Sequence, residues 1–109
     1  MDYNRYRHMW VLTMFDLPVT TKPARKRYTA FRKFLLKSGF RKLQYSVYLR
    51  YAPSRENAEV HIRRVEQNVP PDGEVRILAV TEKQLRSMRI FRGKTRVSSE
   101  RPPEQLELF

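Results

Sequence analysis

Short apolar runs alternate with amphipathic segments along the chain, and this pattern predicts an α+β fold. The first run, residues 8–15, is rich in β-branched and aromatic side chains and ends in Asp16-Leu17-Pro18, which is typical of a buried strand followed by a turn. Residues 40–44 and 45–51 indicate two antiparallel strands with a tight or bulged junction. Residues 74–80 and 88–91 are predicted to form a fourth and a fifth strand.

Two segments have the apolar spacing of helices that face a core. In residues 22–38 the apolar stripe contains Tyr28, Phe31 and Leu35, with Thr21 as the N-cap and Gly39 as a left-handed C-cap. The second helix is expected to begin after Ser54 and to stop before the turn cluster at residues 70–73. The order β-α-β-β-α-β with a trailing fifth strand predicts a ferredoxin-like antiparallel sheet with both helices on one face.

The other face of such a sheet must be wet, covered by a partner or used for nucleic acid. Trp10 and Tyr48 are expected on this open face, and a homodimer with C2 symmetry is the economical way to cover it. The folded domain is predicted to span residues 8–93. A flexible lead, residues 1–7, precedes it, and residues 94–109 form a linker with a short docking tail.

Composition excludes several classes of site. The 109 residues contain no cysteine, so disulfides and thiolate metal sites are absent, and the two histidines argue against structural zinc. No apolar run approaches the roughly 20 residues that span a bilayer. A soluble, cytoplasmic protein with no membrane partner is therefore expected.

The formal net charge of +12 points toward a polyanion, with nucleic acid ahead of a membrane surface or an acidic protein. The charge is concentrated: residues 22–43 hold nine lysines and arginines and no acid, and Glu82 is the only acid in the basic segment 76–97. A merely basic, solvated surface is the alternative, and this clustering argues against it.

Two groups of basic residues are candidates for phosphate binding. Lys22, Arg25 and Lys26 lie at the start of the first helix, near the Asp16 end of the sheet, where helix-terminal N–H groups add donors. Arg86 and Arg89, followed by further basic residues, add a second stripe if their segment lies on the same face. No helix carries the residues of base-specific readout, so salt-dependent binding to the nucleic-acid backbone is expected.

Asp16 is the only acidic residue between Asp2 and Glu56, and it stands at the end of a core strand. A magnesium site for phosphodiester hydrolysis usually needs at least two carboxylates. Two copies of Asp16 facing each other across a dimer axis would supply them in one symmetric site. The alternative is a loop aspartate that only accepts hydrogen bonds from the following turn or helix.

Several motifs together resemble the CRISPR-associated protein 2 family over roughly residues 8–93. They are the strand end Phe15-Asp16-Leu17, the basic segment Ala24-Arg25-Lys26-Arg27, the helix end Ser38-Gly39-Phe40, the element Leu43-Gln44-Tyr45-Ser46-Val47-Tyr48, the strand Val75–Thr81 and Ile90-Phe91. Leu17 and Tyr48 replace a commoner isoleucine and phenylalanine of the family.

The resemblance implies a ferredoxin-like homodimer whose final strand pairs with the sheet of the other protomer. It implies a role in acquiring new spacers, as the bridge between two dimers of the integrase, CRISPR-associated protein 1, with duplex DNA on the basic face. It also implies an alternative, a Mg²⁺-dependent endonuclease acting on RNA or DNA through Asp16. A third interpretation, a toxin-like or translational RNA-binding domain of the same fold, predicts a preference for RNA over duplex DNA.

The tail suggests a second docking activity. Gln105-Leu106-Glu107-Leu108-Phe109 resembles the short linear motif with which bacterial proteins bind the replication sliding clamp. The preferred alternative is that Leu106, Leu108 and Phe109 anchor onto the integrase or onto the protein's own dimer.

Overall fold

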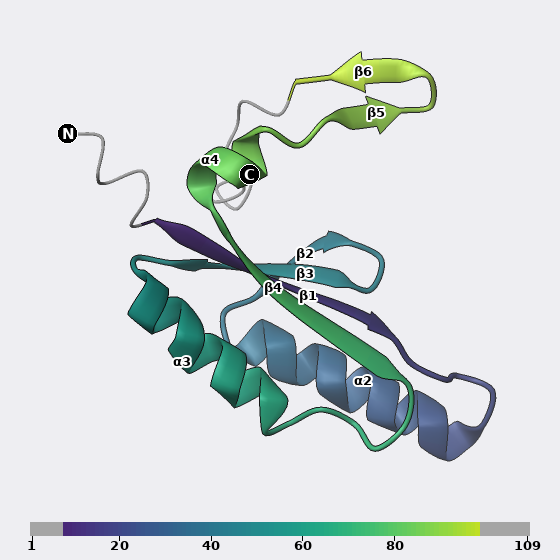
Figure 1. The fold of residues 1–109 in the computed structure, drawn as a ribbon. Coiled ribbons are helices and arrows are strands. Elements are labelled where there is room, and N and C mark those ends of the chain that lie inside the picture. The colour runs from purple at the N-terminus through teal and green to yellow at the C-terminus, as the bar shows by residue number, and fades with distance from the viewer. Residues whose placement is uncertain (1–7, 99–109) are drawn as a thin grey trace.

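The computed structural model describes residues 8–98. A four-stranded antiparallel sheet has the order β2-β3-β1-β4 and carries two long helices on one face (Figure 1). This is the predicted ferredoxin-like arrangement. The strands of the sheet are β1 (Met9–Asp16), β2 (Arg41–Gln44), β3 (Val47–Ala52) and β4 (Glu74–Thr81), and the long helices are α2 (Lys22–Lys37) and α3 (Arg55–Glu66).

β1 is the centre of the sheet. It pairs along its length with β4, from Met9 opposite Thr81 to Asp16 opposite Glu74, and on its other edge with β3. Alternate β1 side chains serve two cores. Val11 and Phe15 pack toward the helices, whereas Trp10 and Leu12 belong to a separate buried cluster on the other face.

The caps of the two helices are those that the sequence predicts. Thr21 Oγ1 accepts from the Ala24 N–H at 3.1 Å, and Ser54 Oγ accepts from the Asn57 N–H at 3.0 Å. Gly39 follows α2 with a φ of 87°, which is the left-handed conformation that ends a helix. Of the predicted apolar stripe of α2, Phe31 and Leu35 are buried and Tyr28 is partly buried, and Ala24 is buried beside them.

The predicted junction between the two middle strands is a bulged hairpin. The register shifts between Lys42 and Gln44, and Ser46 in the turn has a φ of 62°. Phe15 N–H donates to Ser46 O at 3.0 Å, so the turn is fastened to the end of β1. The Asp16 end of the sheet and the β2–β3 turn therefore lie together.

The prediction that Tyr48 shares the open face with Trp10 is wrong. Tyr48 is buried on the helix side, where its ring stacks on Phe15 at a centroid distance of 5.6 Å. Trp10 does lie on the open face, in a cluster with Leu12, Leu49 and Leu85. Successive strand residues point to opposite faces, so Leu49 takes the open face that Tyr48 was expected to use.

The chain after β4 contains more structure than the sequence predicts. The segment expected as a connector forms a short helix, α4 (Glu82–Arg86), which begins with a capping box between Thr81 and Gln84. The trailing strand β5 (Ile90–Arg92) pairs with an additional strand, β6 (Thr95–Val97), inside the segment expected as linker. In Figure 1, α4 and this hairpin lie across the sheet from α2 and α3.

Candidate nucleic-acid interface

The candidate catalytic residue, Asp16, is exposed at the last position of β1. Its neighbour across the sheet is Glu74, the first residue of β4, so the two side chains leave the same face of the sheet. Glu74 could not be recognised as a partner from sequence, because the 57 residues between it and Asp16 hide a pairing that only the strand register creates.

The Glu74 carboxylate is already engaged by a cation. Arg76 Nε donates to Glu74 Oε1 at 2.8 Å, and this hydrogen bond and the arginine's charge lower the pKa of Glu74. The guanidinium thus offsets the negative charge that Glu74 brings to the end of β1. Both side chains are largely exposed, so the pair contributes little to stability.

The described part of one chain does not offer Mg²⁺ a complete set of ligands. Within residues 8–98, no group of three or more histidines, aspartates and glutamates is placed to hold a metal ion. Asp16 has one carboxylate neighbour in register, and that neighbour is paired with Arg76. Hard divalent cations need several oxygen ligands, so a metal site at Asp16 requires ligands from beyond residues 8–98 of one chain.

The three predicted phosphate-binding residues of α2 come together at its exposed first turns. Lys22, Arg25 and Lys26 are all exposed, and the first turn contains no acidic side chain. Arg25 Nη1 donates to Val19 O at 3.1 Å, which holds the guanidinium against the β1–α2 loop and leaves it further donors. This turn is therefore a concentrated positive surface.

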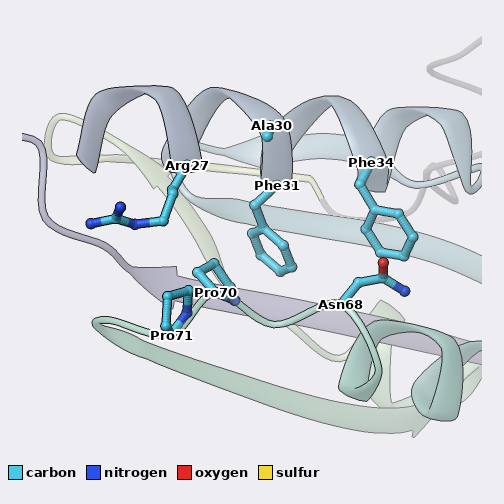
Figure 2. A pocket seen from close by; sticks show the side chains of 7 residues that line it. All are labelled: Arg27, Ala30, Phe31, Phe34, Asn68, Pro70 and Pro71. Carbon is cyan, nitrogen blue, oxygen red and sulfur yellow. The ribbon is translucent and has the colours of Figure 1, made fainter. Parts of the chain in front are cut away.

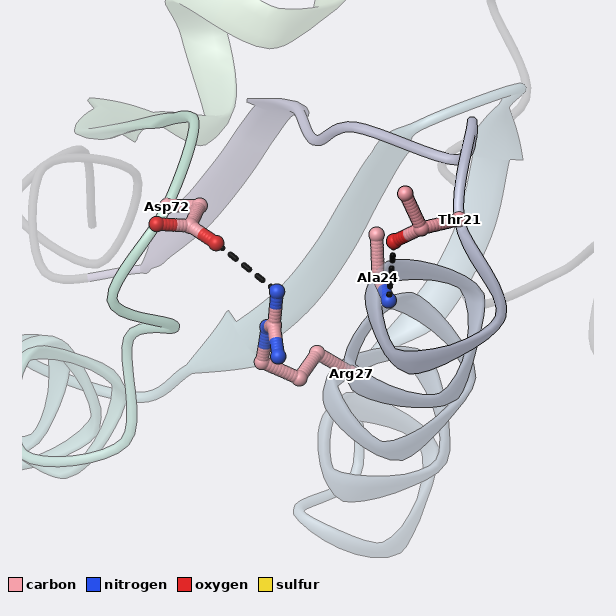
Figure 3. Close-up of polar contacts among 4 residues, drawn as sticks. All are labelled: Thr21, Ala24, Arg27 and Asp72. Atoms are coloured by element: carbon pink, nitrogen blue, oxygen red, sulfur yellow. Dashed lines mark hydrogen bonds and ion pairs between the residues drawn. The ribbon is translucent and has the colours of Figure 1, made fainter.

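Arg27, which follows these residues, has a different role. Its Nη2 lies 2.8 Å from Asp72 Oδ2, so it forms an ion pair that joins α2 to the loop before β4 (Figure 3). The charge of Arg27 is therefore neutralised within the chain, and Arg27 is not counted among the candidate phosphate-binding residues of the same helix.

Backbone N–H groups at the start of α2 are less available for phosphate binding than the sequence predicts. Thr21 Oγ1 takes the Ala24 N–H, as Figure 3 shows, and Thr21 O takes the Arg25 N–H at 2.9 Å. Pro23 has no N–H. Most of the first-turn donors are therefore occupied or missing, and phosphate binding here depends on the side chains.

The second group of predicted basic residues lies elsewhere in the molecule. Arg86 belongs to α4 and lies 3.8 Å from Glu82, and Arg89 is exposed between α4 and β5. Because Leu85 of α4 packs on the open-face cluster with Trp10, this segment lies across the sheet from α2 (Figure 1). The two basic groups do not form one continuous stripe within a single chain.

A hollow on the helix side has a different character. It has a volume of about 230 Å³ and lies between α2 and the loop before β4 (Figure 2). Phe31, Phe34 and two prolines give it a mostly apolar wall, and Arg27 stands at its rim with its charge committed to Asp72. This composition does not suit phosphate binding.

Two further predictions concern the rest of the chain. The docking residues Leu106, Leu108 and Phe109 lie outside the described residues, so their role stays a prediction. In the part of the chain from residue 8 to residue 98, no helix is long and apolar enough to cross a membrane.

Comparison with known proteins gives consistent results. The family model described as CRISPR associated protein Cas2 matches residues 9–88. A "CRISPR-associated endoribonuclease Cas2" of Parvibaculum lavamentivorans is 50% identical over 101 residues, which cover 93% of this chain and 100% of the relative. One of the same name from Flavobacterium psychrophilum is 45% identical over 106 residues, covering 97% and 92% of the two chains.

The fold is also found among solved structures. A structure described as "Crystal structure of cas2" superposes with a TM-score of 0.53 at 25% identity, covering 84% of this chain and 95% of the other. The likeness therefore includes the architecture as well as the sequence.

Proposed function

The chain belongs to the family of CRISPR-associated protein Cas2, and from this premise we propose that it serves CRISPR spacer acquisition as a nucleic-acid-binding architectural subunit. As a homodimer it bridges two dimers of the integrase, CRISPR-associated protein 1, and carries duplex DNA on its basic surface. The observation that carries the proposal is the exposed, acid-free start of α2 with Lys22, Arg25 and Lys26.

This surface has the properties of a sequence-independent phosphate clamp. Its cations project from the start of α2, which is held by the Thr21 cap and by the Arg27–Asp72 ion pair, so the fold fixes the place of their backbone on the surface. Between Asp16 and Glu56 the sequence has no carboxylate that could compete with phosphate for these cations. Contacts of this kind position a duplex without reading its bases, which suits a protein that handles DNA of any sequence.

The test is a variant in which Lys22, Arg25 and Lys26 are all replaced by alanine. Duplex affinity is measured by fluorescence anisotropy at several salt concentrations. Each phosphate contact contributes about −0.9 to the slope of log affinity against log salt, so loss of three contacts should flatten that slope by roughly 2.7. We expect weaker binding at low salt and a flatter slope.

A charge-matched control removes three exposed cations elsewhere, Arg63 and Arg64 of α3 and Lys83 of α4. This variant has the same net charge as the first. It should retain most of the duplex affinity and the steeper slope. Equal losses in both variants would show that net charge alone governs binding and would contradict the assignment to α2.

A second candidate function is a Mg²⁺-dependent endonuclease acting on RNA or DNA. The exposed position of Asp16 at the end of the open sheet face favours it, as does the name endoribonuclease borne by the relatives. Since the described residues of one chain lack a complete ligand set, we propose that the Asp16 of a second copy supplies the further carboxylate.

Replacement of Asp16 by asparagine tests this candidate. Cleavage of labelled RNA and DNA is followed with and without Mg²⁺, and Asp72→Asn serves as a control that alters another exposed aspartate. Cleavage that persists in Asp16→Asn would eliminate the endonuclease assignment. Spacer acquisition that persists in the same variant would support the architectural function.

A further inference from the structure

Tyr45 presents an aromatic ring to solvent beside the basic helix. It lies in the β2–β3 turn and is 72% exposed, more than any other large hydrophobic residue within residues 8–98. Its ring stacks on that of Tyr28 in α2 at a centroid distance of 6.4 Å and an interplanar angle of 26°. The Tyr28 ring in turn meets Phe15 of the core edge-on at 5.9 Å. The exposed Tyr45 ring therefore packs on Tyr28, which itself packs on the hydrophobic core.

Positive charge surrounds this aromatic pair. Lys42 Nζ lies 5.8 Å from the centre of the Tyr45 ring. Burial raises the pKa of Tyr28, but hydrogen bonds with the Tyr45 and Ser46 side chains and the charges of Arg32 and Lys42 outweigh it, so that this pKa falls below its ordinary value. The charges of Arg32 and Lys42 thus contribute to this lowering, and the hydrogen bond with Tyr28 raises the pKa of Tyr45 in turn.

The pair also has a defined position in the molecule. Arg25, Tyr28 and Arg32 are spaced three and four residues apart, so they follow one face of α2, with the aromatic pair between two arginines. Stacking on a helix residue places Tyr45 on the helix side, away from the open sheet face. The bond from Phe15 N–H to Ser46 O joins the turn to the residue before Asp16.

We propose that Tyr45, supported by Tyr28 and flanked by Lys42 and Arg32, is a stacking site for an unpaired base of single-stranded DNA. The inference rests on the proposed nucleic-acid-binding function and adds a strand-specific contact to it. The cations bind the phosphates on either side, and the largely exposed Tyr45 ring takes the base.

The chemistry of the site favours a nucleobase over other occupants. An exposed ring interleaved with cations is the arrangement that binds single strands, since every base has a π-face and every nucleotide a phosphate. Inside a duplex the base faces are covered by their neighbours, and only the two terminal pairs expose a face, so the body of a duplex can use the cations but not the ring. The site therefore distinguishes an unpaired end from the duplex that the start of α2 binds.

The backbone at the turn supports a functional role for this residue. Ser46 has a φ of 62°, a conformation that non-glycine residues rarely adopt. Local strain of this kind persists where the surrounding structure enforces it, as the bond to Phe15 does here. The strained turn holds Tyr45 over Tyr28 before any ligand arrives, which reduces the ordering that binding requires.

The test compares Tyr45→Ala with the wild type on two probes. One is a short single-stranded DNA oligonucleotide with a fluorescent 2-aminopurine base, and the other is a duplex of the same length with both ends closed by non-nucleotide linkers. Loss of one stacked base should weaken binding of the single strand about 5- to 150-fold and leave duplex affinity unchanged. Quenching of 2-aminopurine by the wild type, absent in the variant, would report the stacking directly.

Two further variants act as controls. Tyr45→Phe keeps the ring and should keep most of the single-strand affinity and the quenching. Phe91→Ala removes a ring that is 57% exposed on β5, across the sheet, and should change neither. Because the Tyr45 side chain is largely exposed, its replacement leaves the core intact, and circular dichroism verifies this.

The outcomes separate this inference from the proposed function. If the wild type binds both probes and Tyr45→Ala changes neither affinity, the stacking site is wrong and duplex binding stands. An equal loss on duplex and single strand, or an equal loss in Phe91→Ala, would also overturn the stacking site. If the wild type binds neither probe, both proposals fail.

Discussion

Gly73 fixes the path of the chain where the loop before β4 passes the end of β1. Its φ is 83°, and a Cβ placed on it would lie 2.6 Å from Asp16 O and 3.0 Å from Leu17 Cα. Both neighbours are backbone atoms, which cannot swing away as a side chain can. We expect Gly73→Ala to lower the free energy of unfolding by about 1–3 kcal/mol, measured by urea denaturation.

Gly93 offers a matched control for this prediction. It also has a positive φ, 63°, but within residues 8–98 no heavy atom beyond its own chain neighbours lies within 4 Å of the position a Cβ would take. Gly93→Ala should therefore show only the conformational cost, about 1 kcal/mol. Equal losses at the two positions would mean that the close approach to Asp16 has no consequence.

His61 gives stability a dependence on pH. It is buried, and its Nε2 accepts a hydrogen bond from Arg50 Nε at 3.0 Å. Burial, assisted by the charges of Arg50 and Arg64, lowers its pKa below 6.5. The neutral ring therefore contributes stability above about pH 6.5, and this contribution is lost as the pH falls through the lowered pKa, because the unfolded chain takes up the proton first.

The measurement is the free energy of unfolding between pH 8 and pH 5 for the wild type and for His61→Leu. The wild type should lose stability over this range more steeply than the variant, in which this titration is absent. His8 is present in both proteins and serves as an internal control. If the free energy of unfolding depended on pH in the same way in both proteins, protonation of His61 would not be the cause of the loss of stability.

Alternation along a strand predicts which residues share a face but not which face meets the helices. Tyr48 and Ala52 alternate with Leu49 and Tyr51 in β3, and both sets are apolar enough for a core. Choosing between them needs the register against β1, where Leu12 lies opposite Leu49. For this reason the sequence predicts the sheet face of Trp10 correctly and the sheet face of Tyr48 wrongly.

Among the elements, α4 is the one that closes the open-face cluster. Leu85 is buried there against Trp10, Leu12 and Leu49, and Glu82 at the helix start accepts a hydrogen bond from Trp10 Nε1 at 3.3 Å. Leu85→Ala should lower the free energy of unfolding by about 2–4 kcal/mol through the cavity it leaves. Because Trp10 is the only tryptophan, its fluorescence should shift to longer wavelength as water reaches the ring.

Met88 provides the comparison for this change. It follows α4 and is 38% exposed, so Met88→Ala should cost less than 1 kcal/mol and leave the tryptophan emission in place. An unshifted emission spectrum in Leu85→Ala would show that α4 does not cover Trp10 in solution.

Long elements with caps were predictable, and short ones were not. α2 has sixteen residues, a clear apolar stripe and a capping threonine, so several independent signals agree on it. α4 has five residues and β6 three, which is too short for any period to show. The capping box at Thr81 and Gln84 is the one local signal that could have revealed α4.

The candidate site likewise contains residues that the sequence reveals and residues that only the fold brings together. Asp16 and the cations of α2 could be chosen from sequence, because a lone acid at a strand end and an acid-free helix start are local features. The residues that alter the chemistry of these side chains are distant in sequence and are brought next to them only by the tertiary structure. Glu74 reaches Asp16 through strand register, and Tyr28 reaches Tyr45 across the layer between helix and turn.

At the scale of the molecule, residues 8–98 cover one sheet face well and the other only in part. α2 and α3 pack on the first, whereas α4 covers part of the second (Figure 1). Leu78, opposite Leu12 in register, lies on this second face and is 52% exposed at the centre of β4. An apolar side chain in that position suits the proposed homodimer, in which the open faces of two copies meet.

This geometry predicts that Leu78→Arg converts the dimer to a monomer. Two copies related by a two-fold axis would each bring a new charge to the buried face, where neither could be solvated. Sedimentation velocity measures the change, and the circular dichroism spectrum should stay that of the wild type because Leu78 is outside both buried clusters. Val60→Arg adds the same charge at a residue that is 42% exposed on α3, across the sheet, and should remain dimeric. A dimer that survives Leu78→Arg would exclude the open face as the interface, and the two Asp16 side chains could then not be assumed to meet across it.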